Sequence, residues 1–251
     1  MYSHGGLMSA HPEPQEGLMI VILTGAGISQ ESGIATFRDK GGLWEKVRIE
    51  DVATPGAFKK NPGLVYDFYN ARRKQLLSPD IAPNPAHFAL ARLEAESPAP
   101  VLVITQNVDN LHERAGTKKL LHMHGELLKS RCTACGDVRQ WEHDLTAADS
   151  CPACGCAGHL RPHIVWFEEM PLYLDEIHDA LGRCRTFVSI GTSGQVYPAA
   201  GFAHEARSSG AQVVELNLEP SGGPKVFHEG RYGPASQVVP AWVDEILKTQ
   251  P

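Results

Sequence analysis

The stretch IVILTGAGISQESGIATFRD, residues 20–39, decides the fold of this chain. It begins with an apolar run that is typical of a strand buried on both faces of a parallel sheet. Thr24-Gly25-Ala26-Gly27 then interrupts the run and precedes a predicted helix. Because Gly25 and Gly27 lack a Cβ atom, the turn exposes backbone amides that a pyrophosphate can approach closely. We therefore predict a strand, a glycine turn and a helix that together bind a phosphate group.

The glycine turn does not identify the ligand by itself. The dinucleotide fingerprint GxGxxG needs a third glycine where this chain has Gln30, and the next glycine is Gly33. An ordinary tight turn after a strand would look the same, so that alternative stays open until other segments are considered.

Composition and charge exclude several classes of protein. The chain has 251 residues, 42% of them hydrophobic, which is enough for one large domain with a smaller insert. Its net charge of −6 argues against a nucleic-acid partner. No apolar run approaches the roughly 18 residues of a membrane span, and residues 1–17 resemble no targeting signal. We expect a flexible leader, 1–17, on a monomeric cytoplasmic protein that does not contact membranes.

Apolar runs recur along the chain, and each ends in small or polar residues. Further strands are predicted at residues 101–104, 186–190 and 212–216. The residues that follow them include Gln106, Asn107, Gly191, Thr192, Ser193 and Asn217. Because ligands of parallel α/β sheets bind at the carboxyl ends of the strands, we expect these side chains to gather around a nucleotide.

Predicted helices separate these strands. One begins at Pro85 behind a capping Asn84, and others span residues 197–209 and 242–248. Alternating strands and helices predict an α/β fold, a doubly wound parallel sheet with helices on both faces.

Two cysteine pairs form the most specific motif of the sequence: Cys132-x2-Cys135, fifteen intervening residues, and Cys151-x2-Cys154. Such pairs suit a tetrahedral Zn²⁺ with four thiolate ligands. Four sulfurs leave no place for water or substrate, so we predict one structural zinc. Cys156 is close enough to replace Cys154, and free or redox-active thiols are the alternative. Acidic residues nearby disfavour a zinc ribbon that binds nucleic acid.

Two short segments carry candidate chemical groups. TQNVD, at residues 105–109, places side-chain amides and a carboxylate at a strand end, where they can hold a nicotinamide carboxamide or simply cap the next helix. HMHG, at residues 122–125, has two histidines that share one face if the segment is extended. A histidine can take a proton near neutral pH. Spacing does not choose between His122 and His124.

These motifs, in this order, resemble those of the sirtuins, the NAD-dependent protein-lysine deacylases. The resemblance covers nearly all of the chain after the leader and rests on GAGIS, SGIATFRD, TQNVD, HMHG, the cysteine pairs, GTS and ELN. It implies a Rossmann-like NAD-binding domain formed by residues 18–39, 78–125 and 162–251. It also implies a small domain made of a helical insert, 40–77, and a zinc-binding insert, 126–161.

The resemblance also implies which residues hold NAD, a co-substrate that these enzymes consume. They would be Gly25, Ala26, Gly27, Phe37, Arg38, Gln106, Asn107, Asp109, Gly191, Thr192, Ser193, Asn217 and Ala235. His124 matches the catalytic histidine of the family and would act as general base on the ribose hydroxyls. The implied products are free lysine, nicotinamide and 2′-O-acyl-ADP-ribose, and the zinc takes no chemical part.

Two other functions are compatible with the same motifs. One is mono-ADP-ribosyl transfer, in which an acceptor other than the acyl oxygen captures the ribose. The other is an NAD-sensing module that binds the nucleotide without turnover.

The resemblance places the substrate peptide as an added strand beside residues 164–167, with Val165, Trp166 and Phe167 in contact. An ordinary core strand is the alternative. The family usually has glycine shortly after this phenylalanine, where this chain has Glu168.

Acyl preference is predicted from a helix that begins at Asn61-Pro62. One face of this helix holds Val65, Phe68, Tyr69, Arg72 and Leu76. An arginine thus interrupts an apolar face, and with Tyr69 three residues earlier it can bind a carboxylate. The pair resembles that of class III sirtuins, which remove succinyl and malonyl groups, and Ala53 matches the small residue of their acyl pocket. The alternative is an arginine whose stem packs while its head reaches water.

Overall fold

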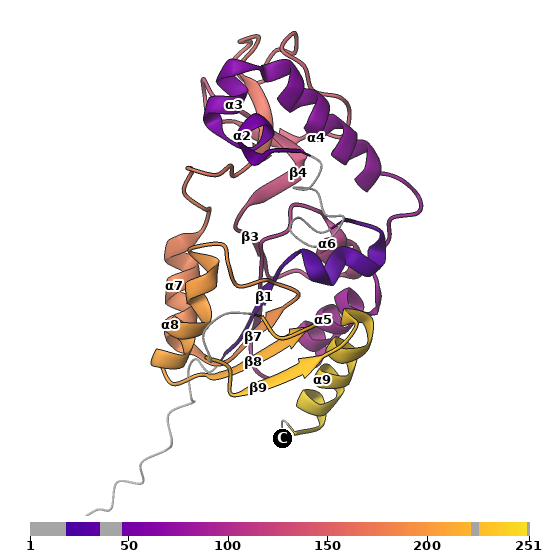
Figure 1. The fold of residues 1–251 in the computed structure, drawn as a ribbon, viewed down its shortest axis with the longest axis vertical. Helices are drawn as coiled ribbons and strands as arrows, with labels where there is room; N and C mark the ends of the chain where they lie inside the picture. Colours follow the sequence, from indigo (N-terminus) through magenta and orange to yellow (C-terminus); the bar gives the residue numbers. More distant parts are fainter. Residues whose placement is uncertain (1–18, 36–46, 222–225, 250–251) are drawn as a thin grey trace, which may run out of the picture.

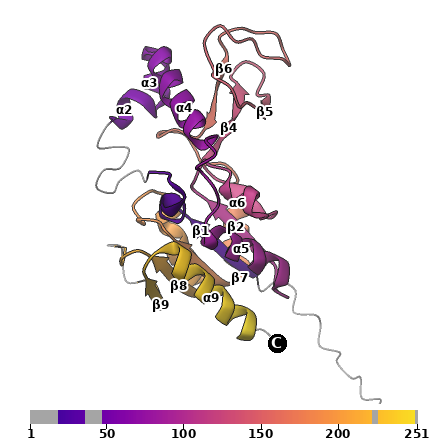
Figure 2. The same cartoon turned by 90° about the vertical axis from the view of Figure 1, so that its right-hand side faces the viewer.

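The computed structural model describes residues 19–35, 47–221 and 226–249. The predicted leader at residues 1–17 and the predicted NAD residues Phe37 and Arg38 lie outside this part of the chain. The described residues form a larger lobe around a six-stranded sheet and a smaller lobe around a three-stranded sheet (Figure 1, Figure 2).

Six parallel strands form the sheet of the larger lobe, in the order β3-β2-β1-β7-β8-β9. Their bounds are β1 Met19–Thr24, β2 Val101–Thr105, β3 Leu120–His122, β7 Cys184–Ile190, β8 Gln212–Asn217 and β9 Glu229–Tyr232. Counted along the chain without the smaller lobe, this order reads 3-2-1-4-5-6, which is that of the Rossmann fold. The order reverses between β1 and β7, where a ligand crevice is expected.

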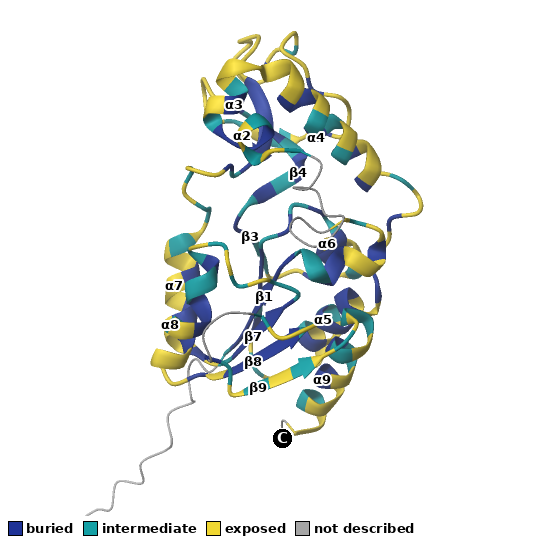
Figure 3. Ribbon diagram, in the orientation of Figure 1, coloured by how far each residue is buried: buried dark blue, intermediate teal, exposed yellow. Residues whose placement is uncertain are grey.

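Helices cover both faces of this sheet, as predicted: α5 Pro85–Glu96, α7 Leu174–Arg183, α8 Phe202–Ser208 and α9 Ala235–Thr249. Alternate residues of β1 point to opposite faces. Ile20 and Ile22 pack against α5 and α9, whereas Val21 and Leu23 pack against α7 and α8. Figure 3 shows the buried strands between these two helical layers. The apolar run that precedes the glycine turn is therefore buried on both faces.

Three helical predictions need correction. The glycine turn leads into a 3-10 helix, η1 (Ala26–Ser32), instead of an α-helix. Residues 197–209 contain a short 3-10 turn, η2 (Ala199–Gly201), before α8, because Pro198 and Gly201 disfavour a regular helix there. The last helix begins at Ala235, well before residue 242, and includes Pro240. Among the described residues, every helix falls short of what a bilayer crossing requires.

The smaller lobe joins the two predicted inserts. Its antiparallel sheet has the order β5-β4-β6, with β4 Gly125–Cys132, β5 Val138–Gln140 and β6 Leu160–Ile164. Its helices are α2 Ile49–Val52, α3 Pro55–Lys60 and α4 Pro62–Leu76. Asn61 caps α4 by accepting a hydrogen bond from the Leu64 amide. The Tyr66 hydroxyl of α4 donates to the Leu160 carbonyl at 2.7 Å, so the helices and the cysteine-bearing sheet pack as one body.

Candidate active site

Polar residues from three strand ends meet at the carboxyl edge of the six-stranded sheet. The Gln106 side chain, after β2, donates to the Thr192 hydroxyl, after β7, at 3.0 Å. The Asn217 side chain, at the end of β8, donates to the Thr192 carbonyl at 3.0 Å. The structure thus brings together residues that lie far apart in the sequence.

Gly25, Gly27 and Gly191 allow two turns to pack against each other without side chains. The Gly25 amide donates to the Ile190 carbonyl at 2.9 Å, and the Gly27 amide donates to the Gly191 carbonyl at 2.8 Å. A Cβ atom on Gly25 would lie 2.8 Å from the Gly191 oxygen, and one on Gly27 would lie 2.8 Å from the Gly191 Cα. Contact between the two turns is therefore a sufficient reason for these glycines, even before a ligand is considered.

A cavity of about 880 Å³ lies in front of these turns and is lined by residues of both lobes. Its volume falls within the roughly 300–1,000 Å³ typical of small-molecule sites. Within the described ranges, His124 and every predicted NAD and substrate residue except Asp109 line this cavity. Asp109 lines a smaller adjoining cavity together with Ala26 and Asn107.

Hydrogen bonds hold Asn107 at the wall of the main cavity and Asp109 behind it. The Asn107 side-chain amide donates to the Gly25 carbonyl and to the Ser29 hydroxyl, each at 3.1 Å. Ser29 in turn donates to the Asp109 carboxylate at 3.0 Å, and the Leu111 amide at the start of α6 (Leu111–Ala115) donates to it at 3.1 Å. Burial raises the pKa of Asp109. The Asp109 carboxylate therefore accepts a hydrogen bond from the first residue of α6 and also lines the adjoining cavity, whereas the Asn107 side chain, among the described residues, makes no hydrogen bond to this helix start.

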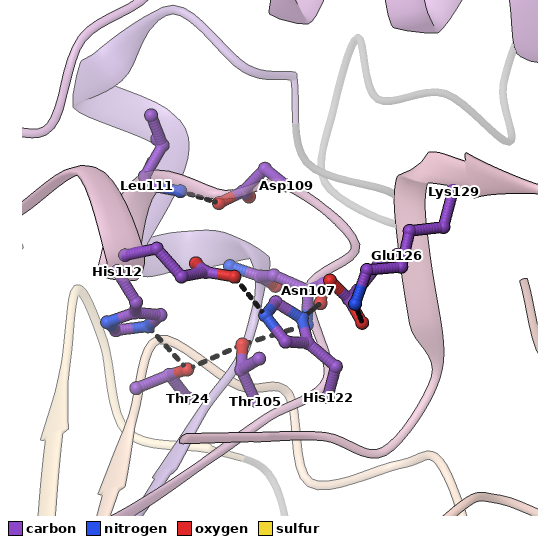
Figure 4. A network of polar contacts seen from close by, with 10 residues as sticks. Thr24, Thr105, Asn107, Asp109, Leu111, His112, His122, Glu126 and Lys129 are labelled. Atoms are coloured by element: carbon purple, nitrogen blue, oxygen red, sulfur yellow. Dashed lines mark hydrogen bonds and ion pairs between the residues drawn. The ribbon is translucent and has the colours of Figure 1, made fainter. Parts of the chain in front are cut away.

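His122 is engaged in the interior network that Figure 4 shows. Its Nδ1 lies 3.2 Å from the Asn107 carbonyl oxygen and its Nε2 lies 2.8 Å from the Glu113 carboxylate. Burial alone would lower the pKa of His122, but the hydrogen bond and charge of Glu113 outweigh burial, so the pKa is raised. Both ring nitrogens face acceptors, which favours the protonated ring, and His122 does not line the main cavity.

His124 is the histidine that faces the main cavity. Its Nδ1 lies 3.0 Å from the Gln106 carbonyl oxygen, which can only accept a hydrogen bond. The proton of the neutral ring is therefore on Nδ1, and Nε2 keeps a lone pair that meets no donor among residues 19–35, 47–221 and 226–249. Burial lowers the pKa of His124, so the ring is neutral at neutral pH. This arrangement is that of a general base.

Tyr69, Arg72 and Ala53 line the same cavity from the smaller lobe. Tyr69 is buried, and its hydroxyl oxygen accepts a hydrogen bond from the Trp166 indole at 2.9 Å. The Arg72 guanidinium lies 5.7 Å from the centre of the Phe68 ring. Tyr69 and Arg72, which the pattern of the helix predicted to act together, therefore line the same cavity.

Residues 165–169 form a turn that follows β6. The substrate peptide is predicted to add beside residues 164–167, and of these only Ile164 belongs to the strand, which ends there. The Val165 amide donates to the His124 carbonyl at 2.8 Å, and the Phe167 amide donates to the Ala53 carbonyl at 3.0 Å. Glu168 has a φ of 75°, a conformation that favours glycine. The backbone therefore keeps the shape that a glycine at this position would adopt.

The four predicted cysteine ligands, Cys132, Cys135, Cys151 and Cys154, lie together with their sulfur atoms within 4.8 Å of one another. Two of the sulfur pairs, Cys132 with Cys154 and Cys135 with Cys151, are 3.8 Å apart. A tetrahedron of sulfurs about 2.3 Å from Zn²⁺ has edges of about 3.8 Å, so this site fits zinc. Cys156 lies outside the group, with its sulfur 4.0 Å from the Cys154 carbonyl oxygen.

Sequence reasoning missed two residues that the structure makes prominent. Ser29 links Asn107 to Asp109, although only its place in GAGIS singled it out. Arg73, next to Arg72 on α4, is 1% exposed and donates to the Leu127 carbonyl at 3.2 Å. A helical projection placed Arg73 off the apolar face, and only the position of β4 explains its burial.

Comparisons with known proteins agree with this architecture. The sequence profile described as Sir2 family matches residues 25–198. The NAD-dependent protein deacylase of Salmonella typhimurium strain LT2 is 58% identical over 237 residues, which are 94% of this chain and 87% of that protein. A solved Sir2 homolog in complex with NAD has a TM-score of 0.83 at 37% identity, covering 94% of this chain and 92% of its own.

A mutant Sir2 homologue solved with 2′-O-acetyl ADP ribose also has a TM-score of 0.83, at 36% identity, and covers 94% of both chains. The family profile spans more than half of the sequence, and the Salmonella protein matches almost all of it. This chain therefore belongs to the Sir2 family.

Proposed function

We propose that this protein is an NAD-dependent protein-lysine deacylase that removes acetyl groups and also succinyl or malonyl groups. The observation that carries the proposal is a neutral His124 with a free Nε2 in a cavity lined by the ends of three strands. The Salmonella relative is named for this activity, and solved relatives bind NAD and 2′-O-acetyl ADP ribose. The products would be free lysine, nicotinamide and 2′-O-acyl-ADP-ribose.

The cavity is suited to NAD in size and in chemical character. We infer that Thr192, Ser193, Asn217 and Ala235, which line its part in the larger lobe, hold the adenosine half. Gly25, Ala26, Gly27 and Gly191 would face the pyrophosphate, and Gln106, Asn107 and Asp109 would hold the ribose and nicotinamide. Phe37 and Arg38 stay predictions from the sequence. When bound, NAD supplies a ribose carbon that becomes electrophilic as its bond to nicotinamide breaks.

His124 would act on the ribose hydroxyls. Because the Gln106 carbonyl fixes the proton on Nδ1, Nε2 is the atom that can accept a hydroxyl proton. Burial keeps the ring neutral, so no prior deprotonation is needed at neutral pH. Asp109 would orient its neighbours instead of accepting a proton, because Ser29 and the Leu111 amide already occupy its carboxylate.

The acyl-lysine would enter from the side of the smaller lobe. A substrate peptide running beside Val165, Trp166 and Phe167 would present its lysine toward His124, whose carbonyl already binds the Val165 amide. Tyr69 and Arg72, with the small Ala53 beside them, would then meet the far end of the acyl chain. A half-buried guanidinium and a buried phenol suit a carboxylate, which supports succinyl and malonyl groups as substrates.

Other features complete the proposal. The larger and smaller lobes would correspond to the NAD-binding and small domains, except that the boundary predicted between residues 161 and 162 moves to the end of β6 at Ile164, because this strand belongs to the smaller sheet. One structural zinc would fold the cysteine segment. We also propose that the protein acts as a cytoplasmic monomer on acylated proteins, without nucleic-acid or membrane partners.

Mass spectrometry of matched acetyl-lysine and succinyl-lysine peptides, with and without NAD, tests this function. We expect both acyl groups to be lost only with NAD, and neither to be lost with His124→Ala. NAD binding without turnover of either peptide would refute the deacylase function. Labelled ADP-ribose on protein would point instead to mono-ADP-ribosyl transfer.

Arg72→Met tests the acyl preference separately. The substitution keeps an unbranched side chain but removes the charge, so succinyl removal should fall well over tenfold while acetyl removal persists. Equal loss of both activities would contradict a carboxylate-binding role for Arg72.

A further inference from the structure

Trp166 is fixed on several sides in the turn after β6. Its side chain is 2% exposed, and the Arg161 guanidinium stacks on the indole with its central carbon 3.2 Å from the ring centre. A guanidinium in this position attracts the face of the ring, and it does so more strongly when both are buried. The Trp166 backbone amide donates to the Glu169 carboxylate at 2.8 Å. These contacts hold both the ring and the backbone of Trp166.

Glu169 holds this arrangement together. Its carboxylate accepts two hydrogen bonds from Arg161, at 2.6 and 3.0 Å, and one from Arg131 at 3.0 Å. Burial alone would raise the pKa of Glu169, but the hydrogen bonds from Arg161 and the Trp166 amide outweigh it and the pKa is lowered. The carboxylate is therefore ionised, and one acidic residue fixes the backbone of Trp166 and the cation that stacks on its ring.

The indole N–H of Trp166 is hydrogen-bonded to the Tyr69 hydroxyl. Trp166 Nε1 donates to the Tyr69 oxygen at 2.9 Å, and an indole N–H can only donate. The phenol must therefore use a lone pair toward Trp166, and its own proton points elsewhere. Within residues 19–35, 47–221 and 226–249, that proton meets no second hydrogen-bond partner, and Tyr69 lines the main cavity. The hydroxyl is thus arranged as a donor toward a ligand.

We propose that Trp166, fixed by Arg161 and Glu169, is a positioning residue for acidic acyl groups, because it orients the Tyr69 hydroxyl as a donor to the acyl carboxylate. The inference deepens the proposed deacylase function and rests on it. Tyr69 and Arg72 would touch the acyl group, whereas Trp166 acts on that group through Tyr69. Without the indole N–H, the phenol could rotate its proton toward other acceptors, and part of the selectivity for a carboxylate would be lost.

Trp166→Phe is the direct test, since phenylalanine keeps an aromatic ring for Arg161 and lacks only the donor and part of the bicyclic surface. We expect the ratio of kcat/KM for succinyl-lysine to kcat/KM for acetyl-lysine to fall by about three- to tenfold, the worth of one hydrogen bond. The fall should come from a higher KM for the succinyl peptide. Any general effect on peptide binding changes both substrates and cancels in the ratio.

Trp141→Phe is the matched control. Trp141 also lies buried in the smaller lobe, but its indole N–H donates to the Asp144 carbonyl at 3.4 Å and it does not line the cavity. We expect the acyl ratio of this variant to equal that of the unmodified protein. Zinc content and thermal unfolding of both variants check that the lobe is intact.

Tyr69→Phe provides the decisive comparison. If Trp166 acts through the phenol, Trp166→Phe should have no further effect on the acyl ratio when Tyr69 is already phenylalanine. An equal effect in both backgrounds would overturn the inference. Glu169→Gln is a second test, because it removes the negative charge that holds Arg161. We expect this variant to lower the ratio of succinyl to acetyl kcat/KM when residue 69 is tyrosine, but not when it is phenylalanine.

The outcomes separate this inference from the proposed function. If the unmodified protein removes neither acyl group with NAD, the deacylase function fails. If it removes both but Trp166→Phe leaves the ratio unchanged, or lowers both activities equally, the deacylase function stands and the positioning role of Trp166 is wrong.

Discussion

At the scale of single residues, the properties of the site depend on which side-chain atoms already have hydrogen-bond partners within the protein. His122 and His124 are two positions apart, but within the described part of the chain both ring nitrogens of His122 have partners, whereas Nε2 of His124 has none. Asp109 and Asn107 are predicted from the same motif, but their hydrogen bonds place one behind the site and the other at its wall. Hydrogen-bond partners therefore distinguish residues that look equivalent in the sequence.

The pH dependence of activity should reflect the buried ring of His124. Burial lowers its pKa below the usual value of about 6.5, and a histidine in the proposed role of general base acts only when deprotonated. As the pH falls, activity should therefore persist to below about pH 6.5 before it declines. A pH profile of kcat/KM on an acetyl-lysine peptide measures this acidic limb. A midpoint above 6.5 would contradict the neutral, desolvated base.

Glu168 should carry measurable backbone strain. With a φ of 75° the residue occupies a region that costs a side-chain-bearing residue about 1–2 kcal/mol. Glu168→Gly relieves this cost but adds freedom to the unfolded chain, so the free energy of unfolding should rise by roughly 0.5–1 kcal/mol. Glu168→Ala is the control, because it removes the same charge and keeps the strain. Equal stability of the two variants in denaturant titrations would argue against strain.

At the scale of elements, the smaller lobe depends on whether its cysteines are held by a metal ion. Cys154 belongs to the group of four sulfurs, and Cys156 does not. A tetrahedral site that loses one thiolate binds zinc far more weakly, and structural zinc contributes directly to folding. We expect Cys154→Ser to lose most of its zinc and to unfold at a lower temperature, whereas Cys156→Ser keeps both properties. Elemental analysis of the purified proteins measures their zinc content. Loss of zinc from Cys156→Ser but not from Cys154→Ser would show that Cys156 is the fourth ligand instead of Cys154.

Long apolar strands were predicted well because both of their faces are buried. β1 and β2 read as continuous apolar runs, and β7 and β8 have mostly apolar centres, FVSI and VVEL, so that few alternatives remain. β3 has three residues, and β9, with the sequence EGRY, has no apolar pattern because it lies at the edge of the sheet. Helix α7 (LDEIHDALGR) also went unpredicted, although Ile177, Ala180 and Leu181 share its buried side.

Sequence analysis could predict those parts of the candidate site that are formed by residues close together in the sequence. The strand ends and the cysteine pairs are local motifs, and family resemblance supplied the choice of His124. Contacts between distant segments were not accessible. Trp166 meets Tyr69 only because β6 lies against α4, and Arg73 is buried only because β4 lies beside it. Such pairs depend on tertiary packing, for which no local pattern exists.

At the scale of the whole molecule, buried histidines link stability to pH. The His87 Nδ1 accepts a hydrogen bond from the Asn84 amide in the capping box of α5, so the ring is neutral. Burial lowers the pKa of His87 to about 4, and burial also lowers the pKa of neighbouring His112, whose ring centre is 5.0 Å away. Below pH 6.5 these two histidines therefore bind more protons in the unfolded chain than in the folded one, and the stability that they contribute falls as the pH falls.

His87→Gln tests this linkage. Glutamine can serve at this position of a capping box but does not titrate. For the unmodified protein, His87 alone should account for a loss of about 2 kcal/mol of unfolding free energy between pH 7 and pH 5. The variant should lose correspondingly less, as denaturant titrations at the two pH values can show. Parallel losses in both proteins would exclude His87 as a source of acid sensitivity.

The interlocked glycine turns have a consequence for the order in which the protein is made. Gly25 and Gly27 emerge early from the ribosome, but their partners at Ile190 and Gly191 are synthesised only after the whole smaller lobe. Until then β1 lacks its β7 neighbour and exposes one apolar edge. Parallel pairing across so long a loop is slow. A nascent chain that has not reached β7 therefore exposes an unpaired strand, β1, of the kind that leads to aggregation. When β7 pairs with β1, the exposed edge is covered and the nucleotide site is completed in the same step.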